Sequence, residues 1–185
     1  AVHIAFNLSL HNYGSDVDVG VMTIINSIRE VLQMPVTGLG NGAQPIIGFN
    51  YGAGENGRVK EAIRYLAAML IIYSTVAWFI ILLIPKFLIG IFTADAALIT
   101  AGVPSLHIYF FGFFLMAFMF TGQTVFVGIG KAKFAIFFSI LRKGIVVIPL
   151  ILLLPIWFGV NGVFLAEPIS NLIGGLACFT TMYFA

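Results

Sequence analysis

The sequence predicts an all-α integral membrane protein, specifically a six-transmembrane-helix bundle. Apolar residues make up 61% of the 185 residues and charged residues only 9%, whereas about a quarter of a soluble domain is charged. Long apolar segments, many near the roughly 20 residues that a bilayer core requires, recur along the chain. None shows the strict alternation of a membrane β-strand, and helices satisfy their own backbone hydrogen bonds in lipid.

Six apolar segments organise the chain into a single lobe, residues 1–185. The expected helices cover residues 1–13, 19–49, 61–84, 97–128, 134–155 and 160–185. The second and fourth are longer than one crossing requires, which favours tilt or extension beyond the bilayer. Because the chain begins and ends inside apolar segments, we expect it to belong to a longer polypeptide.

The loops between these segments differ in charge. Basic residues concentrate at 52–60 and 129–133, whereas the loop after the first segment carries only Asp16 and Asp18. The positive-inside rule therefore predicts that both basic loops are cytoplasmic. We expect a plasma membrane protein, in the cytoplasmic membrane of a bacterium or archaeon. The net charge of +2 is too small and too scattered to indicate a nucleic-acid partner.

One loop has the glycine spacing of a dinucleotide-binding turn. The stretch YGAGENGRVKEA contains Gly52, Gly54 and Gly57 in the pattern G-x-G-x-x-G. A dinucleotide turn follows a β-strand and precedes an acidic residue by about 20 positions. Here the glycines follow a long apolar segment, and residues 75–78 contain no acid. We interpret the three glycines as supplying positive φ angles in a tight turn between two helices.

Catalytic and metal-binding patterns do not occur in the sequence. There is no H-E-x-x-H, no G-x-S-x-G and no cluster of aspartates, which disfavours an intramembrane enzyme. The only cysteine, Cys178, cannot form a disulfide framework or a thiolate metal site. The histidines have no carboxylate at ligand spacing. We therefore expect no metal site and no cofactor.

Several stretches resemble the multidrug and toxic compound extrusion (MATE) family. GLGNGAQPIIGFNYGAGENGRVKEA resembles the eighth helix and following loop of that family. GQTVFVGIGKAKFAIFFSILRKGIVVIPLILLLP resembles its tenth and eleventh helices, and GVNGVFLAEPIS the start of its twelfth. The resemblance covers essentially the whole chain.

This resemblance implies one lobe of a twelve-helix antiporter that exports bulky, often cationic compounds by alternating access. The chain would be the C-terminal lobe, with the N-terminal lobe absent from it. The implied partners are membrane lipid, the other lobe, and small-molecule drugs or toxic organic cations. The coupling cation would be H⁺ or Na⁺. Some members carry a coupling acid in the tenth helix, and the segment 97–128 offers none.

Three charged residues lie deep within the expected helices. Most others lie in loops or near cytoplasmic helix ends, where long side chains such as Arg142 and Lys143 can reach the headgroups. Glu30 lies about 16 Å below the outer end of its helix, beside Arg29, and Glu167 about 10 Å below the same side. An ionised group there costs at least about 2.5–3.5 kcal/mol, so each should face protein or a wet cavity.

Glu30 and Glu167 are candidates for coupling or substrate carboxylates. A carboxyl whose solvation changes between outward- and inward-facing states can take up a proton on one side and release it on the other, or hold a cationic drug in one state. The alternative for Glu30 is a buried ion pair with Arg29 or Arg142. Arg29 can instead meet Glu167, which can also brace the helix kink at Pro168.

Uncharged polar residues are candidates for lining a substrate cavity. They are Asn26, Gln33, Asn41, Gln44, Gln123 and His107. For the amides the alternative is hydrogen bonding between helices, and for the histidine a structural hydrogen bond or a proton relay.

The function that these observations favour is secondary active multidrug efflux, with organic compounds exchanged for H⁺ or Na⁺. Two alternatives are a flippase of related fold for lipid-linked precursors and a non-transporting structural membrane subunit. The flippase would require a more cationic cavity than Arg29 alone provides.

Overall fold

The computed structural model describes Phe6, Ser9 and residues 14–184. Over these residues the regular structure is entirely helical, which confirms the predicted all-α class. Apart from Phe6 and Ser9, the first expected helix (1–13) lies outside the described residues.

The helices vary from a single turn to more than ten turns. In chain order they are α2 (Asp16–Gly52), α3 (Asn56–Leu83), α4 (Pro85–Gly90), α5 (Ala96–Tyr109), η1 (Phe113–Leu115), α6 (Met116–Gly128), α7 (Ala132–Ile140), η2 (Leu141–Val147), α8 (Ile148–Phe158) and α9 (Val160–Phe184). Of these, η1 is a 3₁₀ turn and η2 is a π-helical stretch.

Three helical stretches of the described chain are long and apolar enough to cross a membrane. They are Asn56–Leu83, Ala132–Phe158 and Val160–Phe184. A fourth arises if α5 and the η1–α6 stretch count as one crossing, bent by 43°. The longest helix, α2, is not among them, since polar residues recur along it. It begins before the expected 19–49, where the backbone N–H of Ser15 donates to Asp18 Oδ2 at 2.8 Å.

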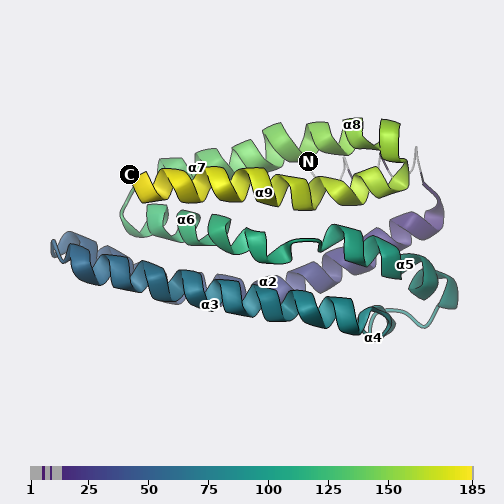
Figure 1. The fold of residues 1–185 in the computed structure, drawn as a ribbon, viewed down its shortest axis with the longest axis horizontal. Coiled ribbons are helices and arrows are strands. Elements are labelled where there is room, and N and C mark those ends of the chain that lie inside the picture. Colours follow the sequence, from purple (N-terminus) through teal and green to yellow (C-terminus); the bar gives the residue numbers. More distant parts are fainter. Residues whose placement is uncertain (1–5, 7–8, 10–13, 185) are drawn as a thin grey trace.

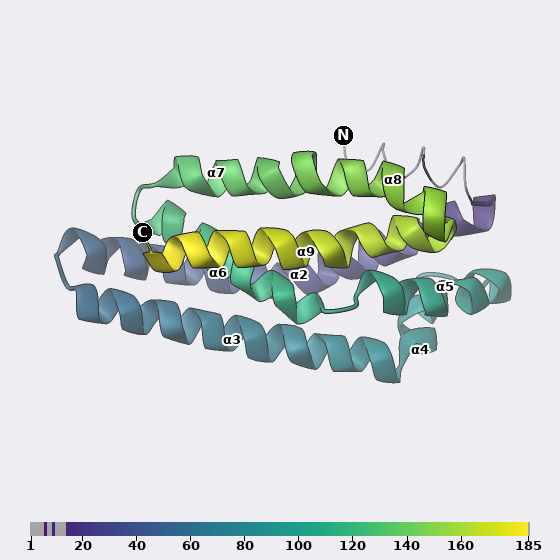
Figure 2. The same cartoon turned by 45° about the horizontal axis from the view of Figure 1, so that its top comes forward.

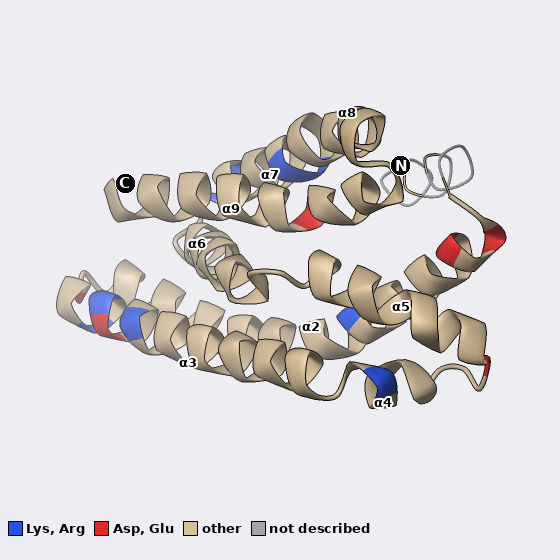
Figure 3. Cartoon of the chain, turned by 45° about the vertical axis from the view of Figure 1, so that its right-hand side comes forward, with Lys and Arg blue, Asp and Glu red and all other residues tan. Residues whose placement is uncertain are grey.

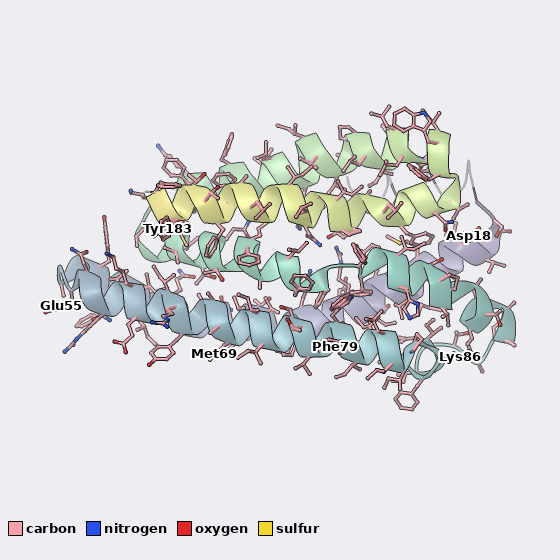
Figure 4. The ribbon with its side chains drawn as sticks, viewed as in Figure 1. Asp18, Glu55, Met69, Phe79, Lys86 and Tyr183 are labelled. Carbon is pink, nitrogen blue, oxygen red and sulfur yellow. The ribbon has the colours of Figure 1, made fainter. Side chains whose placement is uncertain are left out.

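The long helices run side by side, and their connections gather at two ends (Figures 1 and 2). One end holds the α2–α3 turn, the α6–α7 turn and the C-terminus. The opposite end holds the α4 region, the α8–α9 turn and the start of α2. The two basic loops, 52–60 and 129–133, therefore lie at the same end of the bundle. Figure 4 shows Glu55 and Asp18 at opposite ends.

From Tyr65 onward the outward face of α3 is apolar, whereas its first turns expose Arg58, Lys60, Glu61 and Arg64. Figure 4 labels Met69 and Phe79 along this helix, and both side chains are exposed. The buried residues of the same helix, Leu66, Leu70 and Ile81, belong to the main core. A helix that is apolar on its buried and exposed faces alike fits a lipid environment.

The segment 97–128 forms two helices instead of the one continuous helix that was predicted. α5 ends at Tyr109, and Gly112 adopts a left-handed conformation with φ of 67° before η1 and α6 begin. A left-handed glycine commonly ends a helix, because it has no Cβ to clash with the preceding turn. Because the residues on both sides of Gly112 are apolar, the sequence pattern gave no sign that the helix ends there.

The turn at 53–55 joins two helices, which excludes a dinucleotide-binding strand–turn–helix. Only Gly54 of the three glycines has positive φ, at 75°. Gly52 ends α2 and Gly57 lies in α3, so the prediction was wrong for these two. One left-handed residue is enough here, because the N–H of Glu55 donates to the carbonyl of Asn50 at 2.9 Å and closes the helix end.

Glycines bring α2 and α6 into backbone contact. A Cβ at Gly48 would lie 2.8 Å from the carbonyl oxygen of Gly128, and one at Gly40 would lie 2.9 Å from Thr124 Oγ1. Small residues allow such close packing between membrane helices.

Replacing Gly48 with Ala is expected to destabilise the protein by about 1–3 kcal/mol, because the new methyl would press on a backbone carbonyl. Gly52→Ala is the matched control on the same helix, since nothing lies within 4 Å of its Cβ position. Thermal unfolding of the full-length protein in detergent measures both. Equal midpoints for the two variants would show that the close approach does not limit stability.

Candidate functional site

A cluster of buried charged side chains joins three helices in the middle of the bundle. Arg142 Nη1, from η2, lies 3.0 Å from Glu167 Oε1 on α9 and 2.8 Å from Asn171 Oδ1 on the same helix. Arg29 Nη1, from α2, lies 3.8 Å from the same Glu167 oxygen. Figure 3 shows basic and acidic positions partway along the bundle, including an acidic position on α9, in addition to those at its ends. We refer to Arg29, Arg142, Glu167 and Asn171 as the arginine cluster.

Local features of η2 and α9 position the arginine cluster. Gly174 leaves room for the aliphatic stem of Arg142, since a Cβ there would lie 3.0–3.1 Å from the Cβ, Cγ and Cδ atoms of Arg142. Glu167 and Asn171 are four residues apart and therefore lie on one face of α9. Arg142 is in the π-helical stretch, a geometry that often marks functional sites.

The depth of Arg142 differs from the prediction. Its position, ten residues beyond the first residue of the 132–158 stretch, is about 15 Å along the helix axis. The side chain is only 10% exposed, so it does not extend to the headgroups. The reason is that a carboxylate and an amide on α9 offer nearer partners than the lipid interface. Its partner is Glu167, and the alternative pairing with Glu30 is not present.

The arginine cluster borders a cavity with a volume of about 430 Å³. Its polar lining includes Asn26, Arg29, Arg142, Lys143 and Glu167. Among the described residues, the buried Nε atoms of Arg29 and Arg142 have no hydrogen-bond partner. Buried donors are normally satisfied, so these two indicate a place where an acceptor can bind.

Glu30 occupies a different environment from Glu167. It is exposed, and it makes no ion pair or side-chain hydrogen bond with a described residue. The structure thus separates the two candidate carboxylates: Glu167 is held between two arginines, and Glu30 is accessible.

Glu30 belongs to a row of polar residues along one face of α2. The polar stripe consists of Thr23, Ser27, Glu30, Thr37 and Asn41, which are exposed or half-buried and follow the helical repeat, with the exposed apolar Met34 between Glu30 and Thr37. Hydroxyls of the stripe donate to carbonyls of their own helix. A carboxylate and an amide on an exposed face are costly in lipid, so this face fits a neighbouring protein segment or water.

A second hollow lies beside the polar stripe, between α2 and α3. Its volume is about 630 Å³. Its walls include Gly38 and Gly42 from α2, Tyr65 and Met69 from α3, and Glu61 near the loop end. The lining is mainly apolar, with one carboxylate (Glu61), one guanidinium (Arg58) and one amide (Asn50).

The family model described as MatE matches residues 1–153. The chain belongs to the MatE family. Among curated MatE-like relatives, the multidrug export protein MepA of Staphylococcus aureus (strain MRSA252) is 25% identical over 182 residues, which are 97% of this chain and 39% of that protein. MepA of Staphylococcus saprophyticus is 26% identical with the same coverage. The chain thus spans about two fifths of the length of these relatives.

Solved structures show the same MatE fold. One is described as the inward-facing conformation of a multidrug resistance MATE family transporter and has a TM-score of 0.91 at 17% identity, covering 97% of this chain and 42% of that one. Another, a MOP superfamily transporter from Pyrococcus furiosus, has a TM-score of 0.92 at 17% identity, covering 99% of this chain and 42% of that one. Its description states that the reverse polarity of its binding pocket suggests a different function. The chain therefore corresponds to one lobe of a MatE transporter.

The remaining polar candidates of this MatE lobe do not converge on one place. Asn26 lines the cavity of the arginine cluster, and Asn41 is exposed on the polar stripe. The other candidates are half-buried and border neither hollow: Gln33, Gln44, Gln123 and His107. The buried Nε2 of His107 has no partner among the described residues.

Three residues near the arginine cluster were not among the sequence candidates. Asn171 could have been found from its spacing of four from Glu167, which places both on one helix face. Lys143 follows Arg142 and was assigned to the shallow charges. Tyr109, buried with its hydroxyl unpaired among described residues, gave no signal within a run of aromatic residues.

Proposed function

We propose that this chain is the C-terminal lobe of a secondary active multidrug antiporter in the plasma membrane. The antiporter exports organic, often cationic compounds in exchange for H⁺ or Na⁺ by alternating access, with the loops at 52–60 and 129–133 in the cytoplasm. Membership of the MatE family and the similarity to MepA support the class of transport.

The observation that carries the proposal is the polar stripe of α2. Transporters of repeated lobes bind their substrates between the lobes near the membrane midplane. The stripe is an exposed polar face on a helix of a chain whose other long exposed faces, such as that of α3, are apolar. In this arrangement Glu30 faces the substrate pathway, where it holds a proton, a sodium ion or the positive charge of a drug, each in turn.

The mechanism follows from competition for one carboxylate. A cation and a proton cannot both neutralise Glu30, so binding of the ion from outside releases the drug, and binding of the drug from the cytoplasm releases the ion. Each ligand shifts the population of inward- and outward-facing states only through its different affinity for the two. The apolar hollow between α2 and α3 provides a surface for the hydrophobic part of a drug.

Accumulation of a cationic fluorescent dye in cells with and without the full-length protein tests this function. Asn41→Leu is expected to lower dye efflux about fivefold, the equivalent of about 1 kcal/mol for a lost polar contact. Ile72→Leu, on the exposed apolar face of α3, is the control and should leave efflux unchanged. Equal dye accumulation in cells with and without the wild-type protein would contradict drug export.

One observation favours the flippase alternative. The cavity of the arginine cluster contains Arg142 and Lys143 in addition to Arg29, and is therefore more cationic than the sequence indicated. Scrambling of a fluorescent anionic lipid in vesicles that contain the full-length protein separates the two functions, since a drug antiporter leaves the lipid in its original leaflet.

A further inference from the structure

The cavity beside the arginine cluster has an excess of positive charge. Three basic side chains, Arg29, Arg142 and Lys143, line it together with one acidic side chain, Glu167. Three positive charges and one negative charge leave a formal excess of two. Lys143 is exposed, so one excess charge, that of the two arginines over Glu167, lies inside the bundle about halfway along the helices, where uncompensated charge is costly.

The arginines also have donors that no described residue accepts. Arg142 is 9% exposed, and its Nη1 serves both Glu167 and Asn171, while its Nε is buried without a partner among the described residues. Arg29 lies 3.8 Å from Glu167, beyond hydrogen-bond distance, and its Nε is likewise unpaired.

Charge and unused donors together define what can bind there. An organic cation would meet like charges, and a water molecule supplies acceptor lone pairs but no charge. A monovalent anion supplies both acceptor lone pairs and a compensating negative charge. Guanidinium N–H groups form short, strong hydrogen bonds to such acceptors. The volume of about 430 Å³ lies in the range of about 300–1,000 Å³ that is typical of ligand sites.

We propose that the cavity between α2, η2 and α9 binds a monovalent anion through Arg29 and Arg142, with Lys143 at its edge. Chloride and a carboxylate group on a transported compound share the required chemistry, which is a single negative charge with acceptor lone pairs. Glu167 is the internal competitor for the same two guanidiniums. Removing its charge therefore strengthens anion binding, and removing either guanidinium weakens it.

Binding of radioactive chloride and of radioactive acetate to the purified full-length transporter, in sulfate buffer at constant ionic strength, tests the proposal. We expect saturable binding of at least one ion. Arg142→Gln should weaken it about tenfold, Arg29→Gln should also weaken it, and Glu167→Gln should tighten it about tenfold. Lys60→Gln, which removes an equal charge from the exposed start of α3, should have no effect.

The results distinguish the two possible sources of the anion from each other, and both of them from failure of the proposal. Chloride binding alone indicates an inorganic ion, and preference for acetate indicates a substrate carboxylate. Absence of saturable binding for both ions would overturn the site. A change of the same sign in anion binding by Arg142→Gln and by Glu167→Gln would also overturn the site, because a purely structural cluster loses binding when either residue is replaced. Loss of folding cannot produce the expected gain in Glu167→Gln. Binding is measured without transport and so does not depend on the proposed efflux.

Discussion

Glu30→Gln is expected to reduce ion-driven dye efflux by the full-length protein at least about tenfold. The amide has nearly the shape of the carboxyl but cannot change its charge, so it cannot exchange a cation for a drug. A tenfold loss of rate corresponds to an activation free energy higher by about 1.4 kcal/mol. This is a modest effect for the residue that couples ion transport to drug transport. Efflux from vesicles with an imposed proton or sodium gradient measures the effect.

The stability of Glu30→Gln separates coupling from folding. Glu30 is exposed and pairs with no described residue, and substitutions at such positions change stability by only about 0.5 kcal/mol. The variant should therefore unfold at the wild-type temperature. Glu55→Gln in the turn between α2 and α3 is the control and should export dye normally. Intact gradient-driven efflux in Glu30→Gln would eliminate this residue as the coupling group.

The sequence was informative about the helical membrane fold and about how far along their helices Arg29 and Glu167 lie. Composition and segment length predicted the helical membrane fold, because a bilayer restricts backbone structure to few solutions. The prediction that Arg29 can meet Glu167 agrees with their separation of 3.8 Å. Both residues were placed in the outer half of their helices, and depth along a helix follows from counting residues.

The direction of side chains around a helix was harder to predict. Arg142 was expected to extend toward the headgroups, because nothing in its own segment showed the carboxylate and amide on α9. The π-helical stretch changes the helical phase after residue 140, so residues before and after it do not share the faces that a regular helix would give them. Similarly, the left-handed Gly112 follows from backbone geometry that apolar periodicity does not encode.

Charge balance in the arginine cluster leads to the second large effect. Glu167→Gln leaves two facing guanidiniums without a counterion, and breaking a buried pair in this way costs about 3–5 kcal/mol. Arg142→Gln leaves Arg29 and Glu167 as a balanced pair and loses mainly hydrogen bonds, at about 1–3 kcal/mol. We therefore expect Glu167→Gln to unfold at the lower temperature, although both variants remove one charge from the same ion pair.

A double variant tests whether charge balance is the cause. Arg142→Gln combined with Glu167→Gln restores the net charge that the two arginines and the glutamate have in the wild type. It should therefore be more stable than Glu167→Gln alone, with the difference measured as coupling in a double-mutant cycle on thermal unfolding midpoints. If Arg142→Gln were instead the less stable single variant, the bond to Asn171 and the packing on Gly174 would outweigh the electrostatics. In that case Arg142 would act mainly as a structural link between η2 and α9, and the case for an accessible pair of guanidiniums would weaken with it.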